Sequence, residues 1–266
     1  MTVLKASNVS IFFGGLKAVS NFNLTLNEGE LVGLIGPNGA GKTTAFNILT
    51  GVYVPNEGEI LFNVGQKSDE KMINLVGLKP YQITKQGIAR TFQNIRLFKD
   101  LTVLDNVRIA YHFNAKYNTL DALLRTPKFF KEEAVIKEKA LQLLEIFNIH
   151  HKSNELAKNL PYGEQRKLEI ARALATNPKL LLLDEPAAGM NPQETNDLMK
   201  LIQFIREQFK LTILLIEHDM NLVMGICERI SVLDYGQIIA EGTPAEISKN
   251  PKVIKAYLGE ELDTGA

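Results

Sequence analysis

Residues 36–43 combine three glycines, a lysine and a threonine in an order that suits phosphate binding. Their sequence, GPNGAGKT, fits the pattern G-x-x-x-x-G-K-[ST] and lies between a short apolar stretch and a helical pattern that ends at Gly51. Glycines let the backbone curl so that amides and a helix start surround phosphate oxygens, Lys42 adds a charge at the β and γ phosphates, and the Thr43 hydroxyl can ligate Mg²⁺. A glycine-rich turn that only caps a helix is the alternative, and the agreement of pattern and context disfavours it. The predicted nucleotide-binding residues are Gly36, Pro37, Asn38, Gly39, Ala40, Gly41, Lys42, Thr43 and Thr44.

Two carboxylates follow a second apolar stretch, LLLLDEP at residues 180–186. The carboxyl ends of parallel strands form the ligand crevice of an open α/β sheet. Asp184 is therefore the expected Mg²⁺ anchor, through water, and Glu185 is the candidate to polarise a water against the γ phosphate. A solvated strand end explains an isolated Asp-Glu pair equally well, and the phosphate loop in the same chain favours the functional interpretation.

Two further polar residues carry weaker signals. His218 follows the apolar stretch LTILLIE, which predicts that it lies at the same edge of the sheet, although a single histidine there is more often structural than catalytic. Gln93, in ARTFQNI, means little by itself.

The stretch NLPYGEQRKLEIARAL, residues 159–174, predicts a helix whose start can hold a second anion. Pro161 suits the first turn of a helix, and Gly163 permits close approach of a ligand to the backbone. The simpler alternative is a well-capped helix in which Glu164 compensates the positive end of the helix dipole.

The elements that position these residues follow from the apolar patterns. Residues 3–62 alternate in short runs that predict antiparallel strands, residues 131–149 have helical spacing, and strands alternate with a helix over about 192–209 in the C-terminal half. This order predicts an α/β fold of the P-loop NTPase type, with a parallel core sheet, an N-terminal antiparallel β subdomain and an inserted α-helical subdomain. The predicted divisions are 1–86 and 177–242 for the two parts of the core, 87–176 for the helical subdomain and 243–266 for a C-terminal helical tail.

Composition disfavours several classes of protein. The 266 residues include 30 basic and 30 acidic side chains, so no overall field attracts nucleic acid or an anionic membrane. The N-terminus lacks the pattern of a secretion signal, and no run approaches the roughly 18 apolar residues that span a bilayer, so we expect a cytoplasmic protein. Cys227 is the only cysteine, and we expect it to be a small buried apolar residue.

Together and in this order, the motifs resemble those of the ATP-binding subunit of an ATP-binding-cassette (ABC) transporter. Gln93 matches the Q-loop, LPYGE at 160–164 the signature usually written LSGGQ, LLLLDEP the Walker B strand, AAGMNP the D-loop and His218 the switch histidine. The resemblance covers nearly the whole chain. It implies hydrolysis of ATP to ADP and phosphate, with Glu185 as general base, Gln93 and His218 as sensors of the γ phosphate, and Thr43, Gln93 and Asp184 around Mg²⁺.

The resemblance also explains why one chain has two anion-binding features. In this family two ATPase subunits pair head to tail, and each ATP lies between the phosphate loop of one and the signature helix of the other. Tyr162, Gly163 and Glu164 would then contact the nucleotide of the partner. Phe13 falls at the position of the adenine-stacking aromatic, with Phe12 as the competing candidate, and Val19 would flank the adenine or ribose.

Several stretches narrow the subfamily. ARTFQNIRLFKDLTVLDNV, YGEQRKLEIARAL, DEPAAGMNP and the ending EGTPAEISKNPKVIKAYLGEE look like the larger ATPase subunit of bacterial branched-chain amino acid importers. The urea-type importer ATPase and the shorter ATPase of lipopolysaccharide export are near relatives, and the insert between about Tyr111 and Val135 favours the amino acid importer. The implied partners are a second ABC ATPase, identical or different, two integral membrane permease subunits and, indirectly, a substrate-binding protein outside the membrane. The implied location is peripheral, on the cytoplasmic face of the plasma membrane.

Two positions depart from the family pattern. Pro161 replaces the signature serine, and Met190-Asn191 replaces the common Leu-Asp of the D-loop. Two other functions compete with transport. An ABC ATPase that acts on ribosomes or DNA usually has two cassettes or a long coiled coil, and neither is present in this sequence. Asp184-Glu185 and His218 speak against a regulatory module that does not hydrolyse ATP, whereas Pro161 and Asn191 leave that function some room.

Overall fold

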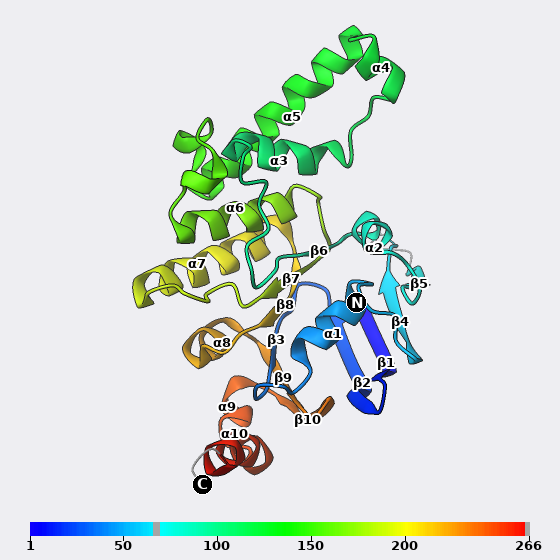
Figure 1. Cartoon of the computed structure of the whole chain (residues 1–266), viewed down its shortest axis with the longest axis vertical. Coiled ribbons are helices and arrows are strands. Elements are labelled where there is room, and N and C mark those ends of the chain that lie inside the picture. The colour runs from blue at the N-terminus through cyan, green and yellow to red at the C-terminus, as the bar shows by residue number, and fades with distance from the viewer. Residues whose placement is uncertain (66–69, 264–266) are drawn as a thin grey trace. The chain divides into compact units, whose positions relative to one another are not determined.

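The computed structural model describes residues 1–65 and 70–263, with the backbone alone for residues 259–263 (Figure 1). The chain forms two compact units. Residues 1–90 and 179–266 make the first, and residues 91–178 make the second, which is inserted in the first along the sequence.

A six-stranded sheet forms the centre of the first unit, in the order β10-β9-β3-β8-β7-β6. Five of its strands run parallel, and β10 pairs antiparallel with β9. The central strands are apolar on both faces because both faces are covered, as parallel sheets require. The strands are β3 (Leu31–Ile35), β6 (Ile88–Arg90), β7 (Leu180–Asp184), β8 (Thr212–Ile216), β9 (Arg229–Asp234) and β10 (Gln237–Gly242).

A four-stranded sheet, β2-β1-β4-β5, belongs to the same unit and is antiparallel, which confirms the prediction for the N-terminal stretch. Phe22 of β2 and Phe62 of β4 are fully buried in one apolar cluster with Phe46 and with Leu182 and Leu214 of the parallel sheet. The strands are β1 (Thr2–Phe13), β2 (Leu16–Asn27), β4 (Glu57–Asn63) and β5 (Met72–Asn74).

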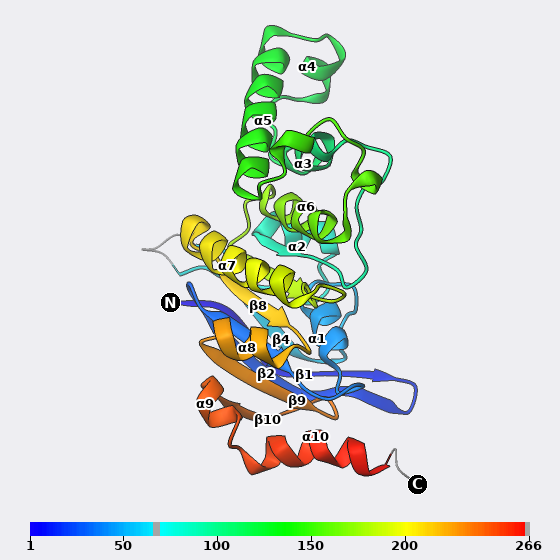
Figure 2. The same ribbon diagram turned by 90° about the vertical axis from the view of Figure 1, so that its left-hand side faces the viewer.

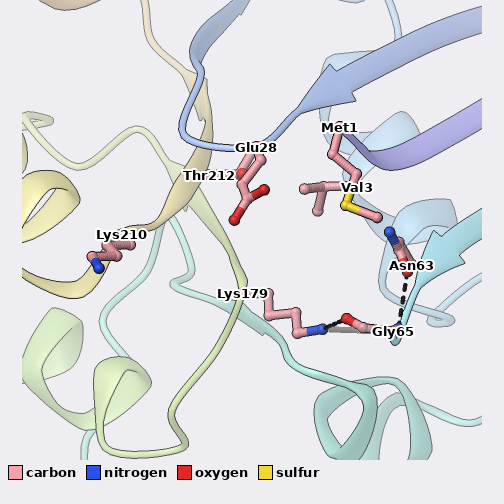
Figure 3. A pocket seen from close by; sticks show the side chains of 8 residues that line it. All are labelled: Met1, Val3, Glu28, Asn63, Gly65, Lys179, Lys210 and Thr212. Carbon is pink, nitrogen blue, oxygen red and sulfur yellow. Dashed lines mark hydrogen bonds between the residues drawn. The ribbon is translucent and has the colours of Figure 1, made fainter. Parts of the chain in front are cut away.

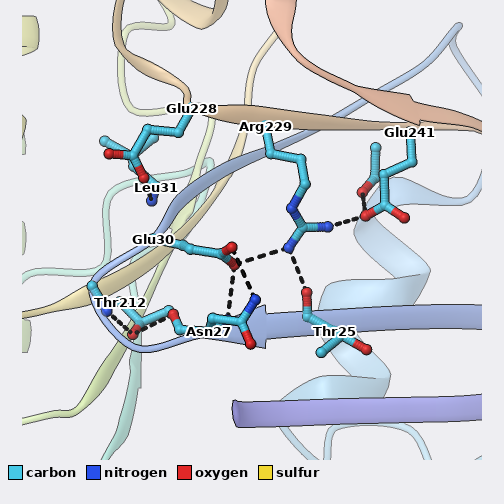
Figure 4. Close-up of polar contacts among 10 residues, drawn as sticks. Thr25, Asn27, Glu30, Leu31, Thr212, Glu228, Arg229 and Glu241 are labelled. Carbon is cyan, nitrogen blue, oxygen red and sulfur yellow. Dashed lines mark hydrogen bonds and ion pairs between the residues drawn. The ribbon is translucent and has the colours of Figure 1, made fainter. Parts of the chain in front are cut away.

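Arg229 ties the two sheets together at one edge (Figure 4). From the start of β9, its guanidinium donates to the Thr25 carbonyl of β2, pairs with Glu30 at 2.9 Å, and also pairs with Glu241 of β10. One planar group with five donors can satisfy three partners in this way, which suits arginine better than lysine.

Helices cover the six-stranded sheet of the first unit. They are α1 (Lys42–Leu49), α2 (Pro80–Gln86), α7 (Pro192–Phe209), α8 (Met220–Ile226), α9 (Pro244–Ile247) and α10 (Pro251–Asp263). Helix α7 has the predicted bounds because Asn191 caps its start and Lys210 ends it in the left-handed conformation. Cys227 is buried next to α8, as predicted.

The second unit is helical (Figures 1 and 2). Helix α5 begins at Pro127, earlier than the predicted residue 131, because Thr126 caps it and proline suits its first turn. Pro161 lies at the N-cap of α6, so its predicted place inside the first turn is wrong by one residue. The helices are α3 (Val103–His112), α4 (Thr119–Leu123), α5 (Pro127–Ile146), α6 (Tyr162–Leu174) and two short 3₁₀ turns, η1 (His150–Lys152) and η2 (Ala157–Asn159).

No helix in the described ranges, 1–65 and 70–263, has the length and apolar character needed to span a bilayer.

Candidate active site

The phosphate loop joins β3 to α1, and two of its glycines are required by space as well as by conformation. A Cβ on Gly36 would lie 1.9 Å from the Leu233 carbonyl oxygen, and a Cβ on Gly41, where φ is +101°, would lie 2.7 Å from the Ala18 carbonyl oxygen. The loop therefore passes close to two neighbouring backbones. Only glycine fits at either position.

Lys42 is buried at the first position of α1, and its ammonium group lies inside the curl of the loop. Its Nζ donates to the carbonyl of Gly36 at 2.7 Å and to that of Pro37 at 2.8 Å. Gly41, at the N-cap, has no side chain to cap the first amides of α1. A buried cation beside uncapped helix amides is the donor set that phosphate groups require, so this loop fits a nucleotide.

Asp184, at the end of β7, is held by a residue that the sequence analysis missed. Arg90 ends the neighbouring strand β6, and its guanidinium pairs with Asp184 Oδ2 at 2.6 Å. The same guanidinium donates to Asn47 Oδ1 of α1 at 2.7 Å and to Thr50 Oγ1 at 3.2 Å. The Arg90 and Asp184 side chains are 6% and 3% exposed. The carboxylate is thus fixed between the strand and the helix that follows the phosphate loop.

Glu185 and His218 meet at the same edge of the sheet, where β7 and β8 end. His218 Nε2 and Glu185 Oε1 are 2.7 Å apart, and the Glu185 amide donates to the Ile216 carbonyl. Glu185 has φ of 47°, a left-handed conformation that is unfavourable for a non-glycine residue. The backbone is thus bent so that the carboxylate faces the histidine.

Glu217 is a second residue that the sequence analysis missed. It is 4% exposed, and its carboxylate accepts from the amide of Ala187 at 2.6 Å and from the amide of His218 at 3.1 Å. Burial raises the pKa of Glu217 above its usual value, and the amide donors oppose that shift. Glu217 therefore joins the segment after Glu185 to the segment that carries His218.

Arg166 organises the second unit around the other predicted residues. It is fully buried in α6 and donates to the carbonyls of Phe92 and Gln93 at 2.6 and 2.7 Å. It also pairs with Glu169 at 2.9 Å. The segment that carries Gln93 is thereby held against the helix whose first turn carries the predicted Tyr162, Gly163 and Glu164. Sequence reasoning could not single out Arg166, because an arginine in a helix usually faces solvent.

The start of α6 has its own polar contacts. Glu164, in its first turn, is held by Lys152 of η1 at 2.7 Å, and the Gln165 side chain donates to the Leu160 carbonyl at 2.8 Å. Pro161, at the N-cap, has no side-chain acceptor for the first amides of α6. Because proline occupies the position where the family pattern has serine, the first amides of α6 have no side-chain cap.

The three residues predicted around the adenine differ in exposure. Phe13 is 44% exposed at the end of β1, and its ring packs edge-on against Tyr53 at 5.2 Å. Phe12 is half-buried, with the Lys17 ammonium 5.4 Å from its ring centre. Exposure favours Phe13 for stacking. Val19 is fully buried, and its side chain lies beside Gly41 of the phosphate loop. It therefore packs against the loop and presents no surface to a nucleotide.

A cavity of about 390 Å³ lies at the amino ends of β7 and β8 (Figure 3). Asp184, Glu185 and His218 lie at or after the carboxyl ends of these strands. Lys179 Nζ donates to the Gly65 carbonyl at 2.6 Å at its rim. Its lining residues are Met1, Val3, Glu28, Asn63, Gly65, Lys179, Lys210 and Thr212. Since ligands of open α/β sheets bind at the carboxyl ends of the strands, this cavity does not belong to the predicted site.

In the part of the chain that the structure describes, no group of three or more His, Cys, Asp or Glu side chains is arranged to hold a metal ion by itself. Mg²⁺ in phosphate-loop proteins keeps several ligands from water and phosphate, so one hydroxyl and one carboxylate suffice. Thr43 and Asp184 are of the right chemical type.

Comparisons with known proteins show the family of the chain. A family model described as ABC transporter matches residues 19–188, and one described as branched-chain amino acid ATP-binding cassette transporter matches residues 237–263. The chain is 48% identical over 258 residues to the high-affinity branched-chain amino acid transport ATP-binding protein LivG of Escherichia coli (strain K12), covering 97% of this chain and 98% of LivG. It is 35% identical over 262 residues to the lipopolysaccharide export system ATP-binding protein LptB of the same strain, covering 98% of this chain and 99% of LptB.

A solved structure has the same fold. The ADP conformation of MJ1267, an ATP-binding cassette of an ABC transporter, matches with a TM-score of 0.81 and 32% identity, covering 97% of this chain and 99% of MJ1267. This similarity confirms the predicted α/β P-loop fold. On the family match, the identity to LivG and the shared fold, the chain belongs to the ABC transporter family, among its ATP-binding subunits.

Proposed function

We propose that this chain hydrolyses ATP to power a transporter that imports branched-chain amino acids. The observation that supports hydrolysis is the 2.7 Å contact between Glu185 and His218, one residue beyond the fixed Asp184. The observation that supports the substrate class is the 48% identity to LivG, against 35% to LptB.

Each site residue has a distinct part in the proposed reaction. Lys42 and the first amides of α1 bind the phosphates, and Thr43, Asp184 and Gln93 hold Mg²⁺, which supplies charge neutralisation at the phosphate oxygens when bound. Glu185 takes the proton of the attacking water at Oε1. His218 holds that carboxylate oxygen in place through Nε2 and senses the γ phosphate, as does Gln93.

The site is completed by a second subunit. In the proposed head-to-tail dimer, identical or mixed, Tyr162, Gly163 and Glu164 contact the nucleotide of the partner. Two integral membrane permease subunits and, through them, an external substrate-binding protein complete the transporter. The chain would therefore sit on the cytoplasmic face of the plasma membrane. A urea-type importer or lipopolysaccharide export is the alternative system.

The variant Glu185→Gln tests the reaction. We expect phosphate release to fall by about 10² to 10⁴-fold, because the amide cannot accept the proton, while ATP affinity stays close to wild type. Glu207→Gln, on the exposed surface of α7, is the matched control and should keep wild-type turnover. Turnover of Glu185→Gln at the wild-type rate would show that another group is the base.

Purification from the native membrane tests the transport system. Two different integral membrane proteins and a second ATPase should accompany this chain, and the complex, reconstituted with its substrate-binding protein, should move leucine, isoleucine or valine inward. Isolation of a self-paired ATPase with an export channel would instead contradict the importer.

A further inference from the structure

Helix α4 presents its apolar face outward and its acidic side chain inward. Leu120, Leu123 and Leu124 are 66%, 76% and 71% exposed, and their i, i+3, i+4 spacing places them on one side of the turn. Asp121 faces the other way, and its carboxylate accepts from the Asn118 amide and is 18% exposed. This is the reverse of the pattern by which a helix covers a core.

The leucines are held out by ordered contacts on both sides of α4. The Asn118 side chain and Asp121 form a reciprocal capping box at its start. After it, Thr126 donates to Asp121 at 3.1 Å and caps α5. Helix α4 contributes no buried residue to the unit. The three leucines therefore add nothing to the core, although the turn that carries them is well anchored.

An exposed aromatic residue follows at the start of α5. Phe130, in the first turns of α5, is 58% exposed and packs edge-on against Phe129 at 5.5 Å. Phe129 in turn packs against Tyr117 at 5.1 Å, and the Tyr117 hydroxyl donates to Glu133 at 2.8 Å. The inner ring thus belongs to the fold while the outer ring is left exposed. We call Leu120, Leu123, Leu124 and Phe130 the apolar tip; Figures 1 and 2 show α4 beside α5 at the end of the helical unit that is distant from α6.

The charges around the apolar tip are mainly positive. Between residues 112 and 131 the sequence has four basic side chains and one acidic side chain, although the whole chain is neutral. The acidic one is Asp121, whose side chain is 18% exposed and pairs with Lys128. Of the two glutamates that follow, Glu132 is half-buried, and Glu133 is occupied by Arg108 and His112. The exposed basic residues are Lys116, Arg125, Lys128 and Lys131. Of these, Lys128 is 59% exposed and lies 3.4 Å from the Asp121 carboxylate, so part of its charge is balanced within the unit.

We propose that the apolar tip and its four cations dock on the surface of an anionic lipid bilayer. Exposed leucines and a phenylalanine enter the headgroup boundary, and lysine and arginine side chains reach the lipid phosphates. A protein partner fits less well, because lysine is depleted from the buried parts of protein interfaces and three of the four cations are lysines. The inference goes beyond the proposed function and requires neither ATP hydrolysis nor a particular transported substrate.

Vesicle flotation of the full chain tests this docking. We expect binding to vesicles that contain phosphatidylglycerol, little binding to pure phosphatidylcholine, and loss of binding at high salt. Leu123→Ser should weaken binding about tenfold, as the burial of one leucine implies. Leu16→Ser, at a leucine of the first unit that is 66% exposed against 76% for Leu123, is the control and should bind as wild type does.

A single fluorescent reporter supplies the second measurement. The chain has no tryptophan, so Leu123→Trp introduces the only one. Its emission should shift to shorter wavelength with anionic vesicles, whereas that of Leu16→Trp should not. Absence of both flotation and shift with anionic vesicles, or equal binding by Leu123→Ser and wild type, would overturn the proposal. Binding that appears only when permease subunits are present in the vesicles would assign the apolar tip to a protein partner and overturn it as well.

Discussion

The buried pair of Arg90 and Asp184 allows a quantitative test that needs no nucleotide. Replacement of Arg90 by methionine keeps much of the side-chain volume and removes the charge that pairs with Asp184 at 2.6 Å. Because the two side chains are 6% and 3% exposed, Asp184 would be left as a charge shielded from water. Breaking a buried pair from one side typically costs about 3 to 5 kcal/mol of unfolding free energy.

A double-mutant cycle separates the pair from the individual residues. In Arg90→Met with Asp184→Asn both charges are absent, so the loss of stability should be smaller than the sum of the single losses by about 1 to 3 kcal/mol. The matched control is Arg206 with Glu228, which has the same 2.6 Å separation in the same unit. Glu228 is 51% exposed, so coupling between Arg206→Met and Glu228→Gln should stay below about 1 kcal/mol.

Urea unfolding followed by circular dichroism measures both cycles in nucleotide-free protein. Additive losses for Arg90 and Asp184, or a coupling no larger than that of Arg206 and Glu228, would refute the argument that burial makes this pair strong. The same arginine also donates to Asn47 of α1, so a strong coupling would mean that Arg90 fixes Asp184 relative to α1. The position of the predicted metal ligand then depends on a residue outside the family motifs.

Three other predictions test the remaining contacts. Gly163→Asp adds a charged side chain in the first turn of α6 and should lower ATP hydrolysis about a hundredfold. It should also abolish ATP-driven pairing in gel filtration and leave nucleotide binding to the single subunit unchanged. Weaker nucleotide binding to the single subunit would contradict the proposal that Gly163 contacts the nucleotide of the partner. Burial raises the pKa of Glu217 above its usual 4.5, so the folded state resists ionisation of this carboxyl group. The resulting loss of unfolding free energy is absent below pH 4.5 and grows as pH rises toward the folded-state pKa. The stability of Glu217→Gln relative to wild type should therefore increase with pH above 4.5 in urea unfolding, and a difference that does not change with pH would contradict this. Burial also raises the pKa of Cys227 to about 12, so a thiol reagent at pH 8 should label it only after unfolding, and rapid labelling of the native protein would contradict the buried position.

Local sequence patterns predict much of this fold because residues that are close in the sequence determine each of these elements. The apolar run at residues 180–183 forms most of a strand that is buried on both faces. The glycines of the phosphate loop predict its tight turn, and Gly36 and Gly41 have no space for a side chain. The bounds of α7 follow from the Asn191 cap and the proline after it. In each case neighbouring residues determine the structure, so the sequence is sufficient.

The contacts that the sequence does not reveal join residues distant along the chain. Strand β6 has only three residues, too few for any periodicity, so nothing in the sequence places Arg90 beside Asp184. Arg166 and Glu217 are charged residues that are buried, which reverses the usual expectation of exposure. Their partners are mostly backbone groups, which carry no sequence signal.

Pro161 and Asn191, the two departures from the family pattern, have unequal structural consequences. Asn191 caps α7, accepting from the Glu194 amide at 3.0 Å, and asparagine caps a helix as well as aspartate does. The substitution therefore removes a charge and leaves the fold unchanged. A serine in place of Pro161 could cap α6 with its own hydroxyl, whereas Pro161 cannot, so the first amides of α6 remain available to an anion. In the proposed dimer those amides replace the missing hydroxyl at the nucleotide of the partner, and the loss is confined to one hydrogen bond, worth about 0.5 to 1.5 kcal/mol or more with a charged acceptor. Pro161 thus removes a hydroxyl and Asn191 removes a charge, while the helices that follow them are preserved, which is the pattern expected when a site is weakened without loss of its geometry.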